Sequence, residues 1–437
     1  MTICRSVSIH NPQEANGFVP TGRTESCLKL LVVLMITGLL ILPFSFSSNN
    51  GRVMITNTGE ISTVKITAES GSSADIQAAV NTVAAAGGGT VYVPAGTWNF
   101  SLRSSTHGVT VPGGVNIIGM GKGVTILEGG IYIDDLTSTG HAIFFFVNGN
   151  GRSTRISGLS IIGWPLNDGT KFGIDGIYMQ YAQDFRIDNC LIDNYTGSGV
   201  LVDRSKGIID HCNFNDSFVQ QHSGWSWGYG ISVAGNITDP NNQNAADWKS
   251  LDTFLGKYDT VDYHYGFAYI EDCVFENSRH NIASARGGFY VARYNTFKHP
   301  RGGAYMVDIH GNGFAAGQGS EFYNNTIIGD AGGNGHVLRG GASVIYNNTY
   351  VNLTSGITLS GDAWDGNYSN PQNIHDTWIW SNTFTNVVIK LQVVVSPPYP
   401  GGSSYYTDIS PPTTPAPPRM PMTAYPYPHH KTLETTP

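Results

Sequence analysis

The chain repeats a short pattern of apolar and polar positions about every 22 residues. Its core is an apolar residue, two variable positions, Cys or Asn, one variable position and a second apolar residue, as in Ile187–Ile192 and Ile270–Phe275. The Cys/Asn position is occupied in turn by Cys190, Cys212, Cys273, Asn295, Asn325, Asn348 and Asn382. A base period interrupted by longer steps is typical of a solenoid, whose coils stack and whose insertions form surface loops. The longest step, between Cys212 and Cys273, predicts a large loop over about 235–265.

A helix followed by a strand is predicted ahead of the repeats. Ser72 to Asp75 supplies a polar start, apolar residues then recur at helical spacing over Ile76–Val83, and Gly87–Gly89 ends the helix. Thr90–Trp98 follows as a β-branched strand that leaves through Pro and Gly.

These two segments carry a resemblance. Ala74–Trp98 (ADIQAAVNTVAAAGGGTVYVPAGTW) and Gly108–Leu127 (GVTVPGGVNIIGMGKGVTIL) resemble the first coils of the pectate-lyase-like superfamily of right-handed parallel β-helices. The resemblance covers about residues 70–395. It implies an all-β parallel β-helix whose open end is capped by the short helix. It says little about activity, because the superfamily includes lyases, hydrolases, esterases, epimerases, tailspikes and inert surface proteins.

The signatures of the common pectin enzymes are missing. Gly335–Val337 lacks the Gly-His-Gly of polygalacturonases, and Gln183–Phe185 has no partner for the pectin methylesterase pattern. Ile208–Cys212 resembles the Trp-Ile-Asp-His-Cys of pectate lyases, but the Trp and the downstream calcium-binding acids are absent. We therefore do not expect an ordinary pectin enzyme.

The ends of the chain differ from its middle. Residues 1–48 are predicted to be a signal peptide or signal anchor, since a long basic region precedes an apolar run, Leu30–Leu42. Residues 49–395 form the predicted β-helix domain. Residues 396–437 contain 12 of the 21 prolines, which predicts a disordered Pro-rich tail for tethering or self-association.

Composition and targeting signals place the chain outside the cytoplasm. The predicted location is extracellular or cell-surface, with a membrane contact only through the N-terminal segment if it is uncleaved. The net charge of −8 argues against nucleic acid as a partner. Eight Asn-x-Ser/Thr sites predict a glycoprotein: Asn99, Asn194, Asn215, Asn236, Asn324, Asn347, Asn352 and Asn367.

The cysteines of the sequence repeat allow two interpretations. Cys190, Cys212 and Cys273 share one ladder position, so we expect buried thiols that act as small apolar groups. The alternative is a disulfide between Cys190 and Cys212, because neighbouring strands lie within disulfide reach.

Basic residues concentrate in the window 279–310 of this acidic chain. Aligning coils by the Gly that ends the middle strand puts Arg286, His310 and Arg339 in one column, with Asp308 beside it. Arg279, His280, Lys298 and Arg301 would line the other edge of the sheet. A strand of about four residues separates the two rows by roughly 13 Å. This arrangement predicts a groove with cationic walls that accepts a polysaccharide.

Such a groove suits cleavage of a polyuronate by β-elimination. The proton α to a carboxylate becomes acidic only when that carboxylate is neutralised, and a base must then remove it. On this hypothesis Arg286 and Arg339 neutralise the carboxylate, His310 is base or acid, and Asp308 orients His310 or holds Ca²⁺. Three aromatic residues are predicted to stack on sugar or to pin the loop, namely Trp225, Trp227 and Tyr265.

Alternatives stay open at this point. The loop carries further residues able to bind Ca²⁺: Asp247, Asp252, Asp259, Asp262 and His264. A glycoside hydrolase would need a second carboxylate across the groove, which Asp362 or Asp365 could supply. The principal alternative to a lyase is a non-catalytic surface, matrix, adhesin or self-assembling protein. The Arg and His residues at strand ends could also have no functional role, since such side chains can stack over turns at the surface.

Overall fold

The computed structural model describes residues 44–49, 52–57, 64–100, 102–103, 107–129, 131–132, 141–147, 151–163, 174–215, 219–222, 225–238, 248, 261–262, 265–299, 304–311, 315–360, 372–395, 405–407 and 426–433. The chain divides into two units, Met1–Ser62 and Thr63–Pro437. In the first unit, β1 (Phe44–Asn49) pairs antiparallel with β2 (Arg52–Asn57). The apolar run of the predicted signal segment lies outside the described residues.

No helix within the described ranges combines the length and apolar character needed to span a membrane.

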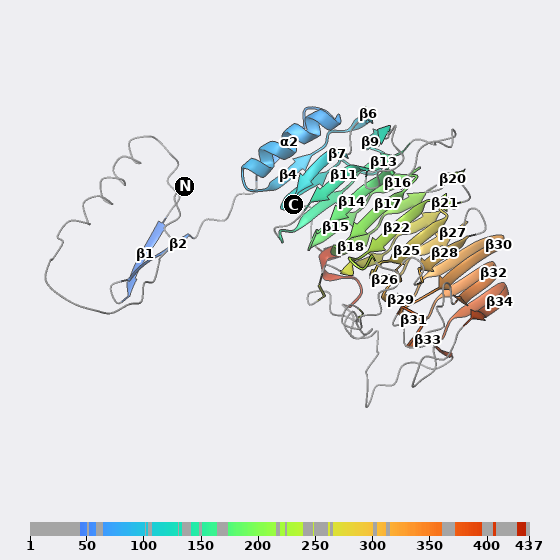
Figure 1. Ribbon diagram of the computed structural model, residues 1–437. Helices are drawn as coiled ribbons and strands as arrows, with labels where there is room; N and C mark the ends of the chain where they lie inside the picture. Colours follow the sequence, from blue (N-terminus) through green and yellow to red (C-terminus); the bar gives the residue numbers. More distant parts are fainter. Residues whose placement is uncertain are drawn as a thin grey trace, which may run out of the picture. The chain divides into compact units, whose positions relative to one another are not determined.

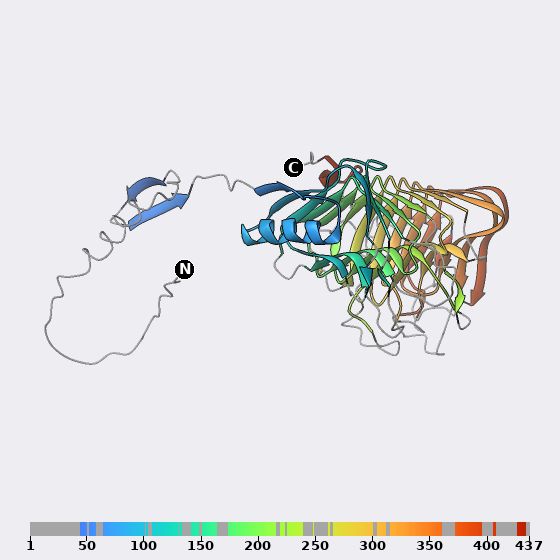
Figure 2. The same cartoon turned by 90° about the horizontal axis from the view of Figure 1, so that it is seen from above.

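The second unit is a right-handed parallel β-helix, as the repeat predicts (Figures 1 and 2). Its described strands form two large sheets. The 12-stranded sheet contains β3 (Val64–Thr67), β4 (Gly89–Tyr92), β8 (Val115–Ile118), β12 (Thr154–Ser157), β15 (Phe185–Asp188), β18 (Lys206–Asp210), β23 (Phe267–Glu271), β26 (Phe289–Arg293), β29 (Gly319–Tyr323), β31 (Ala342–Tyr346), β33 (Thr377–Trp380) and β35 (Tyr405–Thr407).

The 17-stranded sheet forms the other side of the coils. It contains β5 (Gly96–Asn99), β7 (His107–Pro112), β9 (Thr125–Glu128), β11 (His141–Val147), β13 (Ser160–Ile162), β14 (Ile174–Gln180), β16 (Leu191–Asp193), β17 (Ser198–Asp203), β19 (Asn213–Asn215), β22 (Tyr229–Ala234), β24 (Val274–Glu276), β25 (His280–Ala285), β27 (Thr296–Lys298), β28 (Tyr305–Ile309), β30 (Thr326–Leu338), β32 (Thr349–Ser360) and β34 (Thr383–Val395). Two small pairs lie beside the large sheets: β6 (Leu102–Arg103) with β10 (Ile131–Tyr132), and β20 (Val219–His222) with β21 (Trp225–Trp227).

One coil shows how the chain winds. β15 lies in the 12-stranded sheet, and β16 and β17 lie in the 17-stranded sheet. The next coil repeats this order with β18, β19 and β22, each paired parallel with its counterpart. Side chains of one parity therefore stack inside the solenoid from coil to coil.

The predicted helix α2 (Ser73–Ala85) lies at the N-terminal end of the sheets (Figure 1). Ser72 caps its N-terminus, because the Ser72 hydroxyl accepts a hydrogen bond from the Asp75 backbone N–H at 3.2 Å. Its apolar stripe is buried in the core of the solenoid and consists of Ile76, Ala79, Val80 and Val83.

One inward ladder of the middle strands contains a buried histidine. Ile231, Ile282, Val307, His336 and Ile357 lie side by side in consecutive coils and are all fully buried. Burial lowers the pKa of His336 to about 3, so this imidazole is neutral at ordinary pH and takes the place of an aliphatic side chain.

A two-residue turn follows each of the seven strands from β15 to β33 in the 12-stranded sheet. Its first residue is left-handed, with φ between +52° and +60°, at Asn189, His211, Asp272, Tyr294, Asn324, Asn347 and Ser381. Its second residue is the Cys or Asn of the sequence repeat. The left-handed residue reverses the chain within so short a turn, and Asn and Asp tolerate that conformation better than most residues.

The Asn side chains tie neighbouring turns together. Asn325 Oδ1 accepts from the Asn295 backbone N–H at 2.9 Å, and Asn325 Nδ2 donates to Asn348 Oδ1 at 3.1 Å and to the Ala292 carbonyl at 2.9 Å. The cysteines extend this ladder with weaker contacts, since Cys212 Sγ donates to the Ile187 carbonyl of the preceding coil at 3.7 Å. Cys190, Cys212 and Cys273 are free buried thiols, so the alternative of a Cys190–Cys212 disulfide is wrong.

The prediction of a disordered tail is wrong for two stretches of residues 396–437. β35 adds to the edge of β33, with Thr377 beside Tyr405, and a 3-10 helix, η5, covers His430–Leu433. Both stretches find partners for their backbone groups on the solenoid, which composition alone does not reveal. The other tail residues lie outside the described ranges.

Asn325→Ala should lower the free energy of unfolding by about 2–4 kcal/mol, because it leaves buried backbone groups without their side-chain partners. The neighbouring substitution Asn324→Gly should change it by less than about 0.5 kcal/mol, since glycine accepts the left-handed conformation. Urea denaturation of both variants measures the difference. Equal losses would show that the ladder bonds contribute nothing specific.

Candidate functional site

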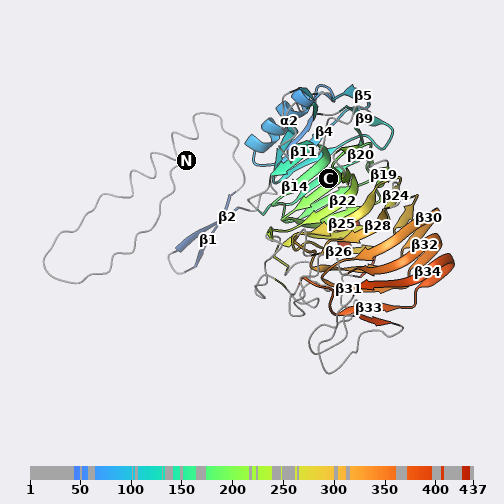
Figure 3. The ribbon, with the colours of Figure 1, turned by 45° about the vertical axis from the view of Figure 1, so that its right-hand side comes forward.

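The candidate site lies on the outer face of the 17-stranded sheet, where β22, β25, β28 and β30 follow one another (Figures 1 and 3). Val307 and Ile309 belong to the core, so Asp308 between them points outward. Pairing places Ala283, Asp308 and Val337 side by side on the three later strands. The site is thus built on rigid strands.

Asp308 is the centre of the site. Arg339 Nε donates to Asp308 Oδ1 at 3.0 Å, and a second guanidinium nitrogen of Arg339 donates to Oδ2. Nε2 of His280 and Nε2 of His310 each lie 3.3 Å from Oδ2. The Asp308 side chain is 0% exposed, while those of His310 and Arg339 are 13% and 15% exposed. The carboxylate is therefore enclosed, and two of its partners reach the surface.

The charges of this cluster (Asp308, Arg339, His280 and His310) are set by burial and by one another. Burial alone would raise the pKa of Asp308, but His310, His280 and Arg339 together hold it well below its usual range. Burial lowers the pKa of His280 to about 4, although Asp308 opposes this. At neutral pH Asp308 is consequently an ionised acceptor and His280 is uncharged.

Tyr229 and Arg279 adjoin the Asp308 cluster, and the sequence analysis did not include Tyr229. Tyr229 pairs with His280 in the sheet, and their rings stack with centroids 5.7 Å apart. Arg279 donates to the Tyr229 hydroxyl at 3.3 Å. Burial raises the pKa of Tyr229, against the opposing charge of Arg279. The signal available in the sequence was an aromatic residue one coil before His280, between Gly228 and Gly230.

The predicted column of Arg286, His310 and Arg339 holds for two of its three members. The His310 and Arg339 backbone N–H groups bond to the carbonyls of Ser284 and Ile309, each at 2.9 Å, which sets both residues in the same register. Arg286 is one residue further along, in a left-handed conformation with φ of +53°, and it is exposed. The alignment by terminal glycines failed because β25 extends one residue past Ser284, the register partner of Ile309, so Gly287 comes one position later in register than Gly311 and Gly340.

The predicted second cationic row does not form among the described residues. His280 turns to Asp308, and Lys298 Nζ pairs with Glu276 at 2.7 Å. His299, next in sequence, pairs with Asp330 at 2.7 Å. Acidic side chains of adjoining coils thus pair with basic residues that were predicted to line a wall of the groove. Arg301 lies outside the described residues.

The predicted aromatic residues take different places. Trp225 and Trp227 belong to β21, which pairs antiparallel with β20. Tyr265 is half-buried and packs with the small apolar cluster of Ile237, Trp248, Ala315 and Ala316. Tyr265 therefore pins the long connection between β22 and β23 to the solenoid, as one of its two predicted roles required.

The structure adds little evidence on the predicted Ca²⁺ ligands and on the predicted glycosylation sites. Of the loop acids proposed for Ca²⁺, only Asp262 is described, and no described group of three or more His, Cys, Asp and Glu is arranged to hold a metal. Asn99, Asn236, Asn347 and Asn352 are exposed, while Asn194, Asn215 and Asn324 are partly buried. Asn367 lies outside the described residues. Glycosylation stays a prediction.

Comparison with known proteins finds similarity of fold alone. No protein-family model and no curated protein sequence matches the chain. Among solved structures, an alginate lyase from Paenibacillus sp. str. FPU-7 aligns with a TM-score of 0.46 and 15% identity, over 76% of this chain and 99% of that chain.

Two further structures align in the same way. The tailspike protein of E. coli bacteriophage HK620 in complex with a pentasaccharide gives a TM-score of 0.48 at 16% identity, over 76% of this chain and 60% of that chain. An Azotobacter vinelandii mannuronan C-5 epimerase A-module gives 0.34 at 15% identity, over 79% and 100%. We draw no functional conclusion from similarities this distant.

Asp308→Ala should lower the free energy of unfolding by about 3–5 kcal/mol at neutral pH, because it leaves buried basic groups without their anion. Since the folded pKa is depressed, this contribution is present above the ordinary aspartate pKa of about 3.9 and is lost as the pH falls below it. Asp330→Ala is the matched control; its side chain is 72% exposed and pairs with His299, so the loss should stay under about 0.5 kcal/mol. Denaturation curves at several pH values test both.

Proposed function

We propose that this protein binds an acidic extracellular polysaccharide on the outer face of the 17-stranded sheet and cleaves it by β-elimination beside Asp308. The observation that carries the proposal is a fully buried carboxylate, Asp308, that lies against two imidazoles and is bonded by a guanidinium at a sheet surface. Asp–His contacts of this kind fix the orientation of an imidazole for proton transfer.

The balance of charge favours an anionic ligand. Arg339 and Arg279 lie in or beside the Asp308 cluster, Arg286 is exposed nearby, and Asp308 is the only acid among these groups. Because Arg keeps its charge at all ordinary pH values, the described residues of the site carry a positive excess. A uronate carboxylate complements such a site, on a molecule that is acidic elsewhere.

The reaction needs two roles, and the described residues supply candidates for both. A cation must neutralise the uronate carboxylate so that the carbon beside it can release a proton, and we assign this role to exposed Arg286. His310, oriented by Asp308, accepts that proton. The electron pair of the broken C–H bond forms a C=C bond, and the glycosidic oxygen leaves with the departing sugar and takes up a proton from water.

The charge state of Asp308 argues against the hydrolase alternative. The acid of a glycoside hydrolase needs a raised pKa in order to donate a proton, whereas the pKa of Asp308 is lowered and its carboxylate is enclosed. Asp362 and Asp365, the predicted partner acids, lie outside the described residues.

A non-catalytic surface protein is the second candidate. It is favoured by the enclosure of Asp308, because three partners that all turn inward toward one carboxylate also form a structural ion cluster. In either case the predicted N-terminal targeting segment and the Asn-x-Ser/Thr sites support an extracellular or cell-surface location.

The test is ultraviolet absorbance of the unsaturated product, with the full chain and a panel of acidic polysaccharides, with and without Ca²⁺. His310→Ala should reduce the rate by about 100-fold or more, which is the usual contribution of a general base. Lys298→Ala is the control, because Lys298 pairs with Glu276 away from Asp308, and its rate should match the parent protein.

Circular dichroism must show that the parent protein and both variants are folded. A flat trace with every polysaccharide from folded parent protein would overturn the lyase assignment. Glycan binding that survives in that case would support the non-catalytic candidate.

A further inference from the structure

A row of charged side chains crosses the outer face of the 12-stranded sheet. Pairing places Asp188, Asp210, Glu271 and Arg293 side by side at the ends of β15, β18, β23 and β26. Arg186 bonds to both carboxylate oxygens of Asp210 at 3.0 Å, and Arg293 Nε bonds to Glu271 at 2.8 Å. These groups are almost fully buried. Charged side chains so deeply buried on an outer sheet face must be covered.

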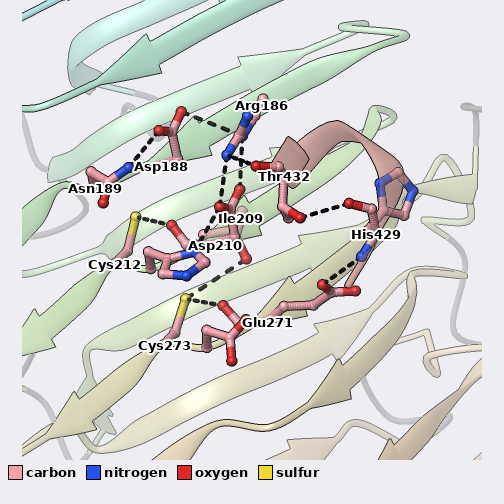
Figure 4. A network of polar contacts seen from close by, with 12 residues as sticks. Arg186, Asp188, Asn189, Ile209, Asp210, Cys212, Glu271, Cys273, His429 and Thr432 are labelled. Atoms are coloured by element: carbon pink, nitrogen blue, oxygen red, sulfur yellow. Dashed lines mark hydrogen bonds and ion pairs between the residues drawn. The ribbon is translucent and has the colours of Figure 1, made fainter. Parts of the chain in front are cut away.

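The far C-terminal segment, residues 426–433, is part of the cover (Figure 4). Arg186 donates to the backbone carbonyls of Lys431 and Thr432, and the His429 backbone N–H donates to Glu271 Oε2 at 3.1 Å. Arg186 and Glu271 are charged, so their hydrogen bonds to the backbone of the segment are stronger than hydrogen bonds between neutral groups.

Side chains fasten both ends of the segment. Lys431 Nζ lies 2.7 Å from Asp184, and the Tyr427 hydroxyl donates to Asp272 at 2.7 Å. The Tyr427 ring stacks on Tyr294 with centroids 3.6 Å apart. The contacts thus extend over several coils of one sheet face, which defines a specific docking site for this peptide.

His429 is the buried centre of the segment. Its Nδ1 accepts from the Lys431 backbone N–H at 3.3 Å, so this nitrogen must be unprotonated in the docked state. The ring lies against Tyr269 and stacks on His430, with centroids 4.8 and 4.4 Å away.

The charged groups around His429 also disfavour its protonation in the docked state. Burial, together with the charges of His430, Arg293, Lys431 and Arg186, lowers the pKa of His429 to about 3. Glu271 is the acid that faces it, through the backbone N–H of His429. An imidazolium would therefore be desolvated among cations and would lose its hydrogen bond to Lys431.

We propose that residues 426–433 form a reversible clasp on the outer face of the 12-stranded sheet, and that proton uptake by His429 opens it. The occupant is the chain's own C-terminal segment. Eighteen residues separate Thr407 in β35 from Pro426, enough to span about 60 Å when extended. β35 is four strand positions from β26, a distance of roughly 20 Å, so the clasp closes within one chain.

The direction of the pH effect follows from the two protonation states. In the released segment His429 titrates near the ordinary value of about 6.5, whereas in the docked segment it does not take up a proton until about pH 3. Below pH 6.5 the released state binds the extra proton. Docking therefore weakens about tenfold per pH unit, by roughly 100-fold at pH 4.5, and is complete above pH 7.

Hydrogen exchange measured by mass spectrometry on the full chain tests the clasp. The protection of a peptide covering 426–433 is compared at pH 7.5 and pH 4.5 after correction for intrinsic exchange rates. We expect about a 100-fold loss of protection at the lower pH, with protection of the β26 peptide retained as proof that the solenoid is folded.

Two variants separate His429 from the other groups that titrate. His429→Asn keeps an acceptor near the Nδ1 position and cannot be protonated, so its protection should no longer depend on pH. His299→Asn is the control, since His299 follows β27 of the 17-stranded sheet and pairs with Asp330 there, and it should behave as the parent protein does.

Three results would overturn the clasp. The first is equal protection of the parent segment at both pH values. The second is an undiminished loss in His429→Asn, which would assign the effect to the acids that hold the segment, Glu271, Asp184 and Asp272. The third is protection that falls on tenfold dilution, which would show that the segment docks on a second copy.

Discussion

From β15 to β33 the solenoid depends on one repeated constraint, the two-residue turn in which a left-handed residue precedes a Cys or Asn that is at least partly buried. The left-handed residue reverses the chain, and the following side chain bonds to the turns above and below. Since these bonds form only when coils stack in one register, the turn fixes which residues of successive coils become neighbours. The Asp308 cluster and the charged row of the 12-stranded sheet both depend on that register. A slip of one residue would turn Asp308 inward and Ile309 outward.

Much of the fold was predictable because its causes are local and periodic. The 22-residue step, the apolar positions around it and the capping residues of α2 are all visible in the sequence. The Cys and Asn residues were correctly assigned to one ladder because buried thiols and amides occupy the same turn position. By contrast, the docking of 426–433 depends on partners more than 130 residues away in the chain, as with Arg293 and Pro426. Composition shows only the prolines of that segment.

The candidate site was predictable in its membership more than in its geometry. Asp308, His310 and Arg339 meet as expected, because they lie at matching places in adjoining coils. Arg286 was misplaced by one residue, since an extra strand residue before Gly287 leaves no mark in a glycine-based alignment. His280 was assigned to the opposite wall, and only its 3.3 Å contact with Asp308 shows otherwise. Tyr229 was missed because one aromatic residue in a strand carries no signal of its own.

The two polar clusters differ in their charge balance, and this difference bears on function. On the 12-stranded sheet Arg186 and Arg293 are matched by Asp210 and Glu271, as in a structural ion-pair row. Around Asp308 the described bases outnumber the one acid, which leaves a positive excess that an anionic polymer can neutralise. The most direct measurement is a crystal structure of the full chain with a bound uronate oligosaccharide. The account predicts a uronate carboxylate next to Arg286, with its sugar ring within reach of His310. An oligosaccharide bound on another face, with the Asp308 cluster untouched, would contradict it.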